Sequence, residues 1–326
     1  MTPSNRELDQ LRSERTELEN HYIDELVNGN LSRRDFLRRG SMIGMSAPLL
    51  GAILAACGSS SPATSSSKST TSAPAATKGG TLRIAISAPT GAVNPLTVAD
   101  AGGLCMLNQT GEFLIFDSNL KLMLEPMLAL SWSPNADASV WTFKLRPGVT
   151  FSNGQAMTSA DVVYTFQQLS DQKNASAALS ALGGVLTPAG VKAVDPMTVQ
   201  FTLVAPNGNF PYLVSSDTYN AIIVPNGTDF SKWQSTFIGT GAFKLHSYTT
   251  NVGATFVPNP TYWGTKPLLS MTSFQFYTSQ TPMITALQGG SVDVVGQFVP
   301  AGASGILNNS SYKIINLTSA NHRELS

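Results

Sequence analysis

Few side chains in this sequence could carry out covalent or metal chemistry. The chain of 326 residues contains 3 histidines and 2 cysteines. The histidines, His21, His246 and His322, are too far apart in sequence to give the ligand spacing of a metal site. The sequence shows neither a phosphate-binding loop nor a G-x-S-x-G nucleophile motif, and nothing marks Glu112 and Asp293 as an acid–base pair. The inventory gives no support to an enzyme, and no cofactor or metal is expected.

Two other features allow both a functional and a structural interpretation. Gly239-Thr240-Gly241 looks like part of a phosphate loop, but it opens a predicted strand, whereas the dinucleotide fingerprint opens a helix. The tryptophans could line a pocket, although their spacing along predicted strands favours core packing. They are Trp132, Trp141, Trp233 and Trp263. His246, on a predicted strand, is expected at the surface.

Cys57 carries a specific chemical expectation. The sequence Leu-Ala-Ala-Cys that ends at this residue resembles a bacterial lipobox, in which the cysteine is lipidated and becomes the mature N-terminus. A Ser-Arg-Arg-Asp-Phe-Leu stretch around Arg33 and Arg34 resembles the twin-arginine export motif. The two motifs occur in the order and spacing of an exported lipoprotein. Residues 1–56 are therefore predicted to be a twin-arginine lipoprotein signal peptide.

The apolar run before the cysteine, from Ser41 to Ala56, could instead be a membrane span or a buried core helix. It is about 16 residues long, whereas a spanning helix needs roughly 20 apolar residues. A short apolar run between a basic stretch and small residues is typical of a signal peptide. The charged stretch within residues 1–30 looks helical, and its charges are expected to form a solvated face.

Residues 57–79 are rich in serine, threonine, proline and alanine, a composition too polar to pack into a core. This segment is predicted to be a linker that holds the folded part away from the membrane. Two acyl chains on Cys57 would make the attachment stable. Cys105 would then have no disulfide partner and is expected to be a small buried apolar residue.

The charge balance argues against one class of partner. The formal net charge is zero, with 20 basic and 20 acidic residues. Neither the part before Cys57 nor the part after it has a strong excess of either sign. Nucleic-acid binding therefore has no electrostatic support.

Residues 80–326 show the patterns of a mixed strand-and-helix fold. TLRIAIS, residues 81–87, alternates as a half-buried strand does. Residues 130–133 and 140–146 flank PNADAS as a hairpin, and Thr158 to Asp161 predicts a capping box at the start of a helix. Further strands are expected in VKAVDPMTVQFTLVAP, YNAIIVP, GTGAFKLHSY, NVGATFVP and MTSFQFYT, and a helix in PMITALQG. Because the strands lack regular βαβ spacing, the pattern favours α+β or mixed-sheet α/β.

Several blocks after residue 78 resemble the family 5 extracellular solute-binding proteins of ABC importers, the peptide- and nickel-binding group. GGTLRIAIS, followed by NPL, resembles the opening strand and turn of that family. The stretch LALSWSPNADASVWTFKLRPGVTFSNGQAMTSADVVYTFQQL resembles its most recognisable segment. GTGAFKLHSY, NPTYWGTKP and ALQGGSVDVV then follow in the family's order.

The resemblance implies an α/β fold of the type II periplasmic-binding-protein kind, with two lobes that close on a ligand. Family members usually continue well beyond the length of this chain. Residues 80–326 are therefore expected to form one lobe with its extra subdomain, with the second lobe largely missing.

The same resemblance implies ligand contacts at three segments of the present lobe. They are Ser87, Ala88, Pro89 and Thr90; Ser216, Asp217 and Tyr219; and Gly239, Thr240 and Gly241. The glycines would let a ligand approach the backbone closely. The alternative, that Gly239 and Gly241 only permit a tight strand entry, remains equally open.

The function implied is that of a lipid-anchored substrate-binding component of an ABC importer, on the outer face of the bacterial cytoplasmic membrane. It would capture peptides or a similar solute and deliver it to the permease subunits. A secreted hydrolase on a lipoprotein tether and a non-functional fragment of a binding protein are the alternatives. Nickel held by several histidines is disfavoured, because only two histidines follow Cys57.

Overall fold

The computed structural model describes residues 77–118 and 123–315, and before them residues 12, 16–28, 31–32, 35–37, 40 and 45–56. The chain divides into two compact units, Met1–Pro74 and Ala75–Ser326. Arg33, Arg34, Cys57, His322 and most of the predicted linker lie outside the described residues.

The first unit contains helices α2 (Glu17–Val27) and α4 (Ala47–Ala56). A capping box begins α2 at Thr16. The Thr16 hydroxyl accepts from the backbone N–H of Glu19, and the Glu19 carboxylate accepts from the backbone N–H of Thr16. Helix α4, APLLGAILAA, is apolar on all sides. Among the described residues, no helix is both long and apolar enough to span a bilayer.

In the described part of the second unit, five strands form a mixed sheet in the order β11-β1-β10-β9-β8. The opening strand β1 lies between β10 and β11 and runs parallel to both, while β9 runs antiparallel to β10 and β8. The bounds are β1 (Thr81–Ser87), β8 (Phe243–Thr249), β9 (Gly253–Pro258), β10 (Met271–Tyr277) and β11 (Val294–Val295). The opening strand therefore pairs in full register with a strand more than half the chain away.

A second, antiparallel sheet has the order β4-β5-β7-β6. Its strands are β4 (Ala129–Pro134), β5 (Val140–Leu145), β6 (Leu186–Asp195) and β7 (Thr198–Leu203). Trp141, Phe143 and Leu145 share one face of β5, and all three are buried. Helix α6 (Ser159–Ser170) packs on β6 and β7 and begins with the predicted capping box between Thr158 and Asp161.

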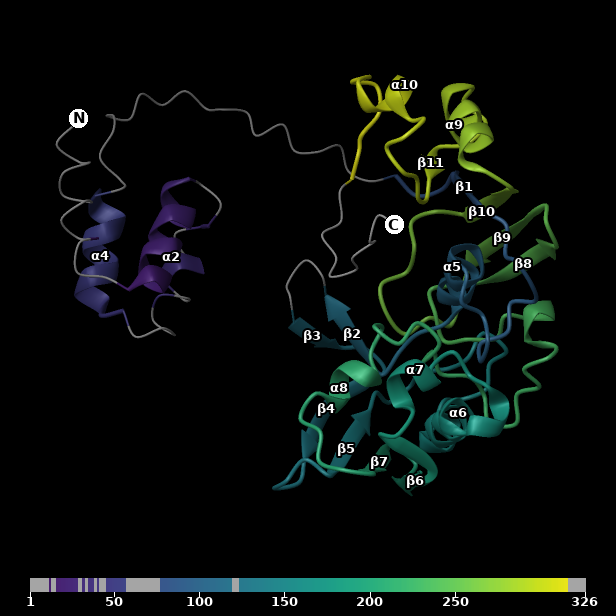
Figure 1. Ribbon diagram of the computed structural model, residues 1–326, viewed down its shortest axis with the longest axis horizontal. Coiled ribbons are helices and arrows are strands. Elements are labelled where there is room, and N and C mark those ends of the chain that lie inside the picture. Colours follow the sequence, from purple (N-terminus) through teal and green to yellow (C-terminus); the bar gives the residue numbers. More distant parts are fainter. Residues whose placement is uncertain are drawn as a thin grey trace. The chain divides into compact units, whose positions relative to one another are not determined.

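The remaining described elements are a pair of short strands, several helices and two 3-10 turns. Strands β2 (Ile115–Ser118) and β3 (Met123–Pro126) form an antiparallel pair. The helices are α5 (Ala101–Thr110), α7 (Leu179–Leu182), α8 (Phe210–Leu213), α9 (Gln280–Gln288) and α10 (Ser304–Leu307), with 3-10 turns η1 (Gln172–Asn174) and η2 (Trp233–Ser235). In Figure 1 the five-stranded sheet lies in the upper part of this unit and the four-stranded sheet in the lower part, with α6 beside the latter.

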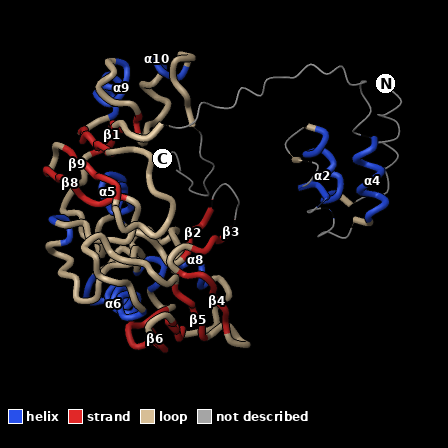
Figure 2. The backbone as a smooth tube through the Cα atoms, turned by 180° about the vertical axis from the view of Figure 1, so that it is seen from behind, coloured by secondary structure: helices blue, strands red, loops and turns tan. Residues whose placement is uncertain are grey.

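One apolar core runs through both sheets of the second unit, from Ile86 on β1 to Phe276 on β10. Trp141 and Trp233 are buried in it, and Trp132 and Trp263 pack against it, as the core interpretation of the tryptophans predicted. The strands of the two sheets are seen from the opposite side in Figure 2. The structure confirms the expected mixed-sheet α/β fold.

One predicted element is wrong. The segment YNAIIVP, residues 219–225, is not a strand, although Ala221, Ile222, Ile223 and Val224 are almost completely buried. Its backbone bonds to loops and side chains instead: Ile223 donates to the carbonyl of Glu112, and Val224 to the hydroxyl of Thr165. A short apolar run predicts burial but cannot distinguish a strand from a buried loop.

Candidate functional site

The first predicted ligand segment, Ser87 to Thr90, lies where β1 ends. Ser87 and Thr90 are exposed, whereas Pro89 is buried. The segment is held on both sides: the backbone N–H of Ala88 donates to the carbonyl of Tyr277, and the Thr90 hydroxyl donates to Asp100, the N-cap of α5, at 3.0 Å. The loop is thus fixed between the end of β10 and the start of α5.

The second segment lies beside β2. The Ser216 hydroxyl accepts from the backbone N–H of Asp117 at 2.9 Å, and the Ser216 N–H donates to the carbonyl of Ile115. Asp217 is exposed, and partial burial together with the neighbouring Asp117 carboxylate raises its pKa. Tyr219 is 49% exposed. This segment presents a carboxylate and a phenol to solvent on a fixed backbone.

The third segment, Gly239 to Gly241, is packed against the end of α5. A Cβ atom on Gly239 would lie 2.0 Å from the carbonyl oxygen of Thr110, and one on Gly241 would lie 2.9 Å from the same atom. The Gly241 N–H donates to that carbonyl at 2.8 Å. The close approach of two backbone segments therefore requires glycine at Gly239 whether or not a ligand binds there.

Thr240 reaches inward to Glu112, a carboxylate that sequence reasoning set aside as isolated. Glu112 is only 4% exposed and accepts three hydrogen bonds: from the Thr240 hydroxyl at 2.8 Å, the Tyr262 hydroxyl at 3.0 Å and the Trp263 indole N–H at 2.8 Å. The side chain thereby joins the end of α5, the Gly239–Gly241 segment and the loop after β9.

Burial dominates the electrostatics of this carboxylate. Desolvation raises the pKa of Glu112 despite the three donors and the nearby positive charge of Arg146. The Arg146 guanidinium lies 4.1 Å from the centre of the Trp263 ring and donates to the carbonyl of Met127. Burial and the Glu112 carboxylate also raise the pKa of Tyr262. Because Thr240, Tyr262 and Trp263 all donate to Glu112 inside the fold, the arrangement positions loops.

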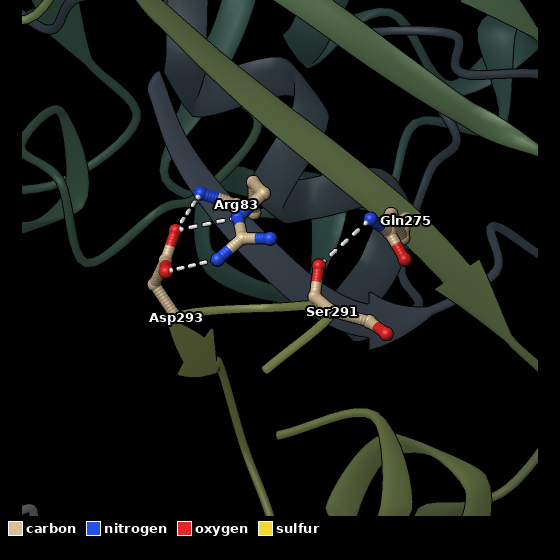
Figure 3. Close-up of polar contacts among 4 residues, drawn as sticks. All are labelled: Arg83, Gln275, Ser291 and Asp293. Atoms are coloured by element: carbon tan, nitrogen blue, oxygen red, sulfur yellow. Dashed lines mark hydrogen bonds and ion pairs between the residues drawn. The ribbon is translucent and has the colours of Figure 1, made fainter. Parts of the chain in front are cut away.

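Asp293 is likewise engaged rather than isolated. Its carboxylate binds the Arg83 guanidinium through both oxygens, at 2.7 Å and 3.1 Å, and also accepts from the Arg83 backbone N–H (Figure 3). The same view shows Gln275 donating to the Ser291 carbonyl at 3.3 Å. The Arg83 guanidinium lowers the pKa of Asp293. These contacts fasten β11 to β1 at the edge of the sheet.

A cavity of about 370 Å³ opens between Asn153 and the loop of residues 225–238. Asp229 and Lys232, which form an ion pair at 3.3 Å, lie on its rim with the buried Trp233 below. None of the ten predicted ligand residues lines this cavity.

The structure thus brings the predicted segments together only in part. Gly239–Gly241 contacts Thr110 at the C-terminal end of α5, and Ser216 contacts β2 a few residues further on, whereas Ser87–Thr90 contacts the N-terminal end of α5. Because α5 has ten residues and a helix of that length is about 15 Å long, the first and third segments contact points about one helix length apart. His246 is exposed on β8, and no group of His, Cys, Asp and Glu residues in the described part could hold a metal ion.

Glu112 is the residue that sequence reasoning missed. Its three donors come from blocks that the sequence did single out, GTG and NPTYWG, but they lie 128 to 151 residues downstream. Cys105 was expected to be buried; it is partly buried and packs against the core, and burial raises the pKa of its thiol to about 11.

Comparison with known proteins identifies the family of this chain. Residues 123–324 match the model of the bacterial extracellular solute-binding proteins, family 5 (middle region). The chain therefore belongs to this family, whose members are substrate-binding proteins and not enzymes.

Curated relatives agree with that assignment. The chain is 27% identical over 218 residues to the nickel-binding periplasmic protein of Escherichia coli, covering 62% of this chain and 37% of the relative. It is 29% identical over 196 residues to the periplasmic oligopeptide-binding protein OppA of the same organism, covering 54% and 35%. The chain thus spans little more than a third of the length of these relatives.

Solved structures show the same fold. The murein tripeptide binding protein MppA of Escherichia coli matches with a TM-score of 0.63 and 25% identity, covering 71% of this chain and 48% of that one. The chain therefore has the architecture of part of a periplasmic binding protein.

Proposed function

We propose that this chain is the substrate-binding component of an ABC importer that captures peptides or a similar solute outside the cytoplasmic membrane and delivers it to the permease subunits. The observation that carries the proposal is the family match over residues 123–324, in a fold shared with peptide-binding proteins. The names of the relatives include both an oligopeptide-binding and a nickel-binding protein. Peptide is preferred because no metal-binding group of side chains occurs in the described residues.

The ten predicted ligand residues then divide by accessibility. Ser87, Thr90, Asp217 and Tyr219 are exposed and could touch a solute. Thr240 is fully buried, with its hydroxyl on Glu112, and therefore supports the site from behind. A phenol beside a carboxylate would suit the apolar side chains and ammonium groups of a peptide.

A thermal-shift screen of the full-length protein against peptide pools tests this proposal. A peptide that binds the native state should raise the melting temperature in a concentration-dependent way. Tyr219→Ala should weaken binding of any hit by about tenfold, since exposed aromatic residues often dominate such contacts. Tyr212→Ala, at a tyrosine 42% exposed on α8, is the matched control and should bind as the wild type does. The peptide assignment fails if no pool shifts the melting temperature.

The proposal extends to location and anchoring. Residues 1–56 would serve as the twin-arginine lipoprotein signal, residues 57–79 as the linker and Cys57 as the lipidated residue of a protein held on the outer face of the membrane. Cells fed radiolabelled palmitate should label the wild type and Cys105→Ala, but not Cys57→Ala. Unchanged labelling of Cys57→Ala would remove the anchor from the proposal. Arg33→Lys combined with Arg34→Lys should leave unprocessed precursor in the cytoplasm.

A tethered hydrolase, the alternative from another class, gains no specific support. Its catalytic groups would have to come from carboxylates such as Glu112 and Asp293, and both are occupied in structural contacts. The family to which the chain belongs consists of binding proteins.

A further inference from the structure

The first unit contains an apolar cluster of its own. From α2 it includes the fully buried Ile23, with Tyr22 and Leu26 packed alongside. From α4 it includes Leu49, Leu50 and Ile53, each no more than 8% exposed. The two helices lie side by side in both Figure 1 and Figure 2. The apolar helix of the predicted signal is therefore covered by the helix that precedes the export motif.

The export motif itself takes part in this packing. Phe36, from the Ser-Arg-Arg-Asp-Phe-Leu stretch, is fully buried in the same cluster, while the adjacent Leu37 is 44% exposed. Ser32 and Asp35 hydrogen-bond to each other at 2.6 Å, and the Phe36 N–H donates to the Ser32 carbonyl, which sets a helical turn that directs Phe36 inward. The phenylalanine of the predicted export motif is thus hidden.

A close backbone contact fixes the chain between motif and signal helix. Gly40 lies directly against Leu50 of α4, where an added Cβ atom would be 2.5 Å from a methyl carbon of that leucine. Leu31 is also buried in the cluster, and its N–H donates to the carbonyl of Glu25 near the end of α2. The contacts therefore continue from α2 through the motif to α4.

The two helices differ in a way that explains their pairing. Helix α4 is apolar all round, and such a helix is stable only when it is buried in protein or in a membrane. Helix α2 is amphipathic: Ile23 faces the cluster, whereas His21 and Asp24 are exposed, and Asp24 forms an ion pair with Arg12. One face of α2 therefore matches α4, and the other keeps the pair in water.

We propose that the apolar face of α2 is an intramolecular docking surface for the signal helix α4 and for Phe36, which shields both in the precursor until they meet the membrane. The proposal rests on the export and anchoring function proposed above. A unit this small, with so few buried side chains, is marginal without further support. A bilayer can therefore compete for α4, because acyl chains replace the contacts that α2 provides.

Amide hydrogen exchange of the purified full-length precursor tests the docking. Ile23→Asp places a charge in the cluster and should speed exchange of the α4 amides, residues 49–56, at least about fivefold. Val27→Asp is the matched control: it makes the same kind of change on the same helix, at a residue 49% exposed, and should leave exchange as in the wild type. Equal exchange in Ile23→Asp and the wild type would overturn the proposal.

Vesicle flotation measures whether the release of α4 increases binding of the precursor to membranes. On vesicles of phosphatidylethanolamine and phosphatidylglycerol at about 7:3, Ile23→Asp precursor should float several-fold more than the wild type, because α4 is released to insert. Val27→Asp adds the same negative charge and should float as the wild type does. If Ile23→Asp does not increase flotation, shielding of the signal is wrong.

These measurements separate the docking from the export function. Both use purified precursor and need no export machinery. Faster exchange in Ile23→Asp supports docking even where palmitate labelling shows that Cys57 is not lipidated. Unchanged exchange in Ile23→Asp overturns the docking proposal even where Cys57 is labelled and Arg33 and Arg34 are required for export.

Discussion

Glu112 shows how a single charged residue can organise this lobe. A buried carboxylate loses its hydration, and the donors from Thr240, Tyr262 and Trp263 offset only part of that loss, since burial still raises its pKa. The Glu112 side chain is nevertheless well placed to hold neighbouring loops together. A carboxylate accepts at both oxygens, and it holds two loops that are distant in sequence against the end of α5.

The pH dependence of stability follows from the direction of that pKa. Because the pKa of Glu112 is higher in the folded than in the unfolded protein, its ionisation opposes folding, so this cost is absent near pH 4 and appears as pH rises through the folded pKa. Glu112→Gln removes this cost and can keep all three hydrogen bonds, because the Tyr262 hydroxyl can accept from the amide. We expect this variant to match or exceed the wild type in free energy of unfolding at about pH 7.5, with the difference shrinking toward about pH 4.5.

Glu112→Ala is the informative comparison. It leaves the three donors without an acceptor and opens a small void, which should cost about 2–4 kcal/mol in the free energy of unfolding. Urea unfolding of the three proteins across the pH range measures both effects. If the glutamine variant is as unstable as the alanine variant, the negative charge beside Arg146 stabilises the fold and our interpretation of the pKa direction is wrong.

Gly239 offers a second test at the residue level, because its two interpretations predict different measurements. If packing against the Thr110 carbonyl requires glycine, Gly239→Ala should lower the free energy of unfolding by about 2–4 kcal/mol. Gly208→Ala is the control, since a Cβ there meets nothing within 4 Å. A Gly239→Ala protein with unchanged stability but weaker peptide binding would instead favour direct approach of a ligand to the backbone.

At the level of the elements, α6 depends on a local signal that tertiary contacts reinforce. Thr158 and Asp161 form the capping box, and the second Asp161 oxygen accepts from the Asn226 N–H at 2.8 Å. Thr158→Ala should cost about 1 kcal/mol, the usual value for a lost N-cap. Asp161→Ala should cost more, because Asp161 is 2% exposed and also anchors the loop at Asn226.

Chemical denaturation of these two variants checks that order. Thr187→Ala, at an exposed threonine on β6, makes the same chemical change as Thr158→Ala without touching a helix end and should stay within about 0.5 kcal/mol of the wild type. A larger loss in Thr158→Ala than in Asp161→Ala would show that the link to Asn226 contributes nothing.

The elements also show which parts of the fold local sequence could predict. The strand at residues 81–87 and the Thr158 capping box depend on near neighbours, and both were confirmed. The expected half-burial of that strand was wrong, because Ala85 and Ile86, which point to opposite faces, are both buried. The pairing of β1 with β10, the three donors of Glu112 and the burial of Phe36 involve residues distant in sequence, which leave no local pattern. The segment 219–225 failed for a related reason, because its hydrogen-bond partners lie in a loop and on helix α6 and not in a neighbouring strand.

At the level of the whole molecule, the predicted ligand residues also separate what the sequence can predict from what only the fold decides. The family resemblance implied ligand contacts at three loops, and the structure shows that Thr240 turns inward to a carboxylate while Tyr219 is exposed. Which of these loops contact a solute is decided by the complete ligand site, and the chain spans only about half of the solved relative MppA. The ligand assignments therefore remain predictions for the binding experiments above.

The two units should be thermodynamically separate, because each described core draws its residues from its own unit. The core of the second unit begins at β1 with Ile84 and Ile86, and the cluster of the first unit ends at Ile53 and Leu54. Removing residues 1–56, with Cys57→Ser to prevent lipidation, should therefore shift the melting temperature of the second unit by no more than about 2 °C. Ile86→Ala in the same shortened chain is the positive control and should lower it clearly, since loss of a buried isoleucine costs about 2–5 kcal/mol. A large drop on removing residues 1–56 alone would mean that the first unit stabilises the second, and cleavage at the proposed signal would then change the stability of the second unit.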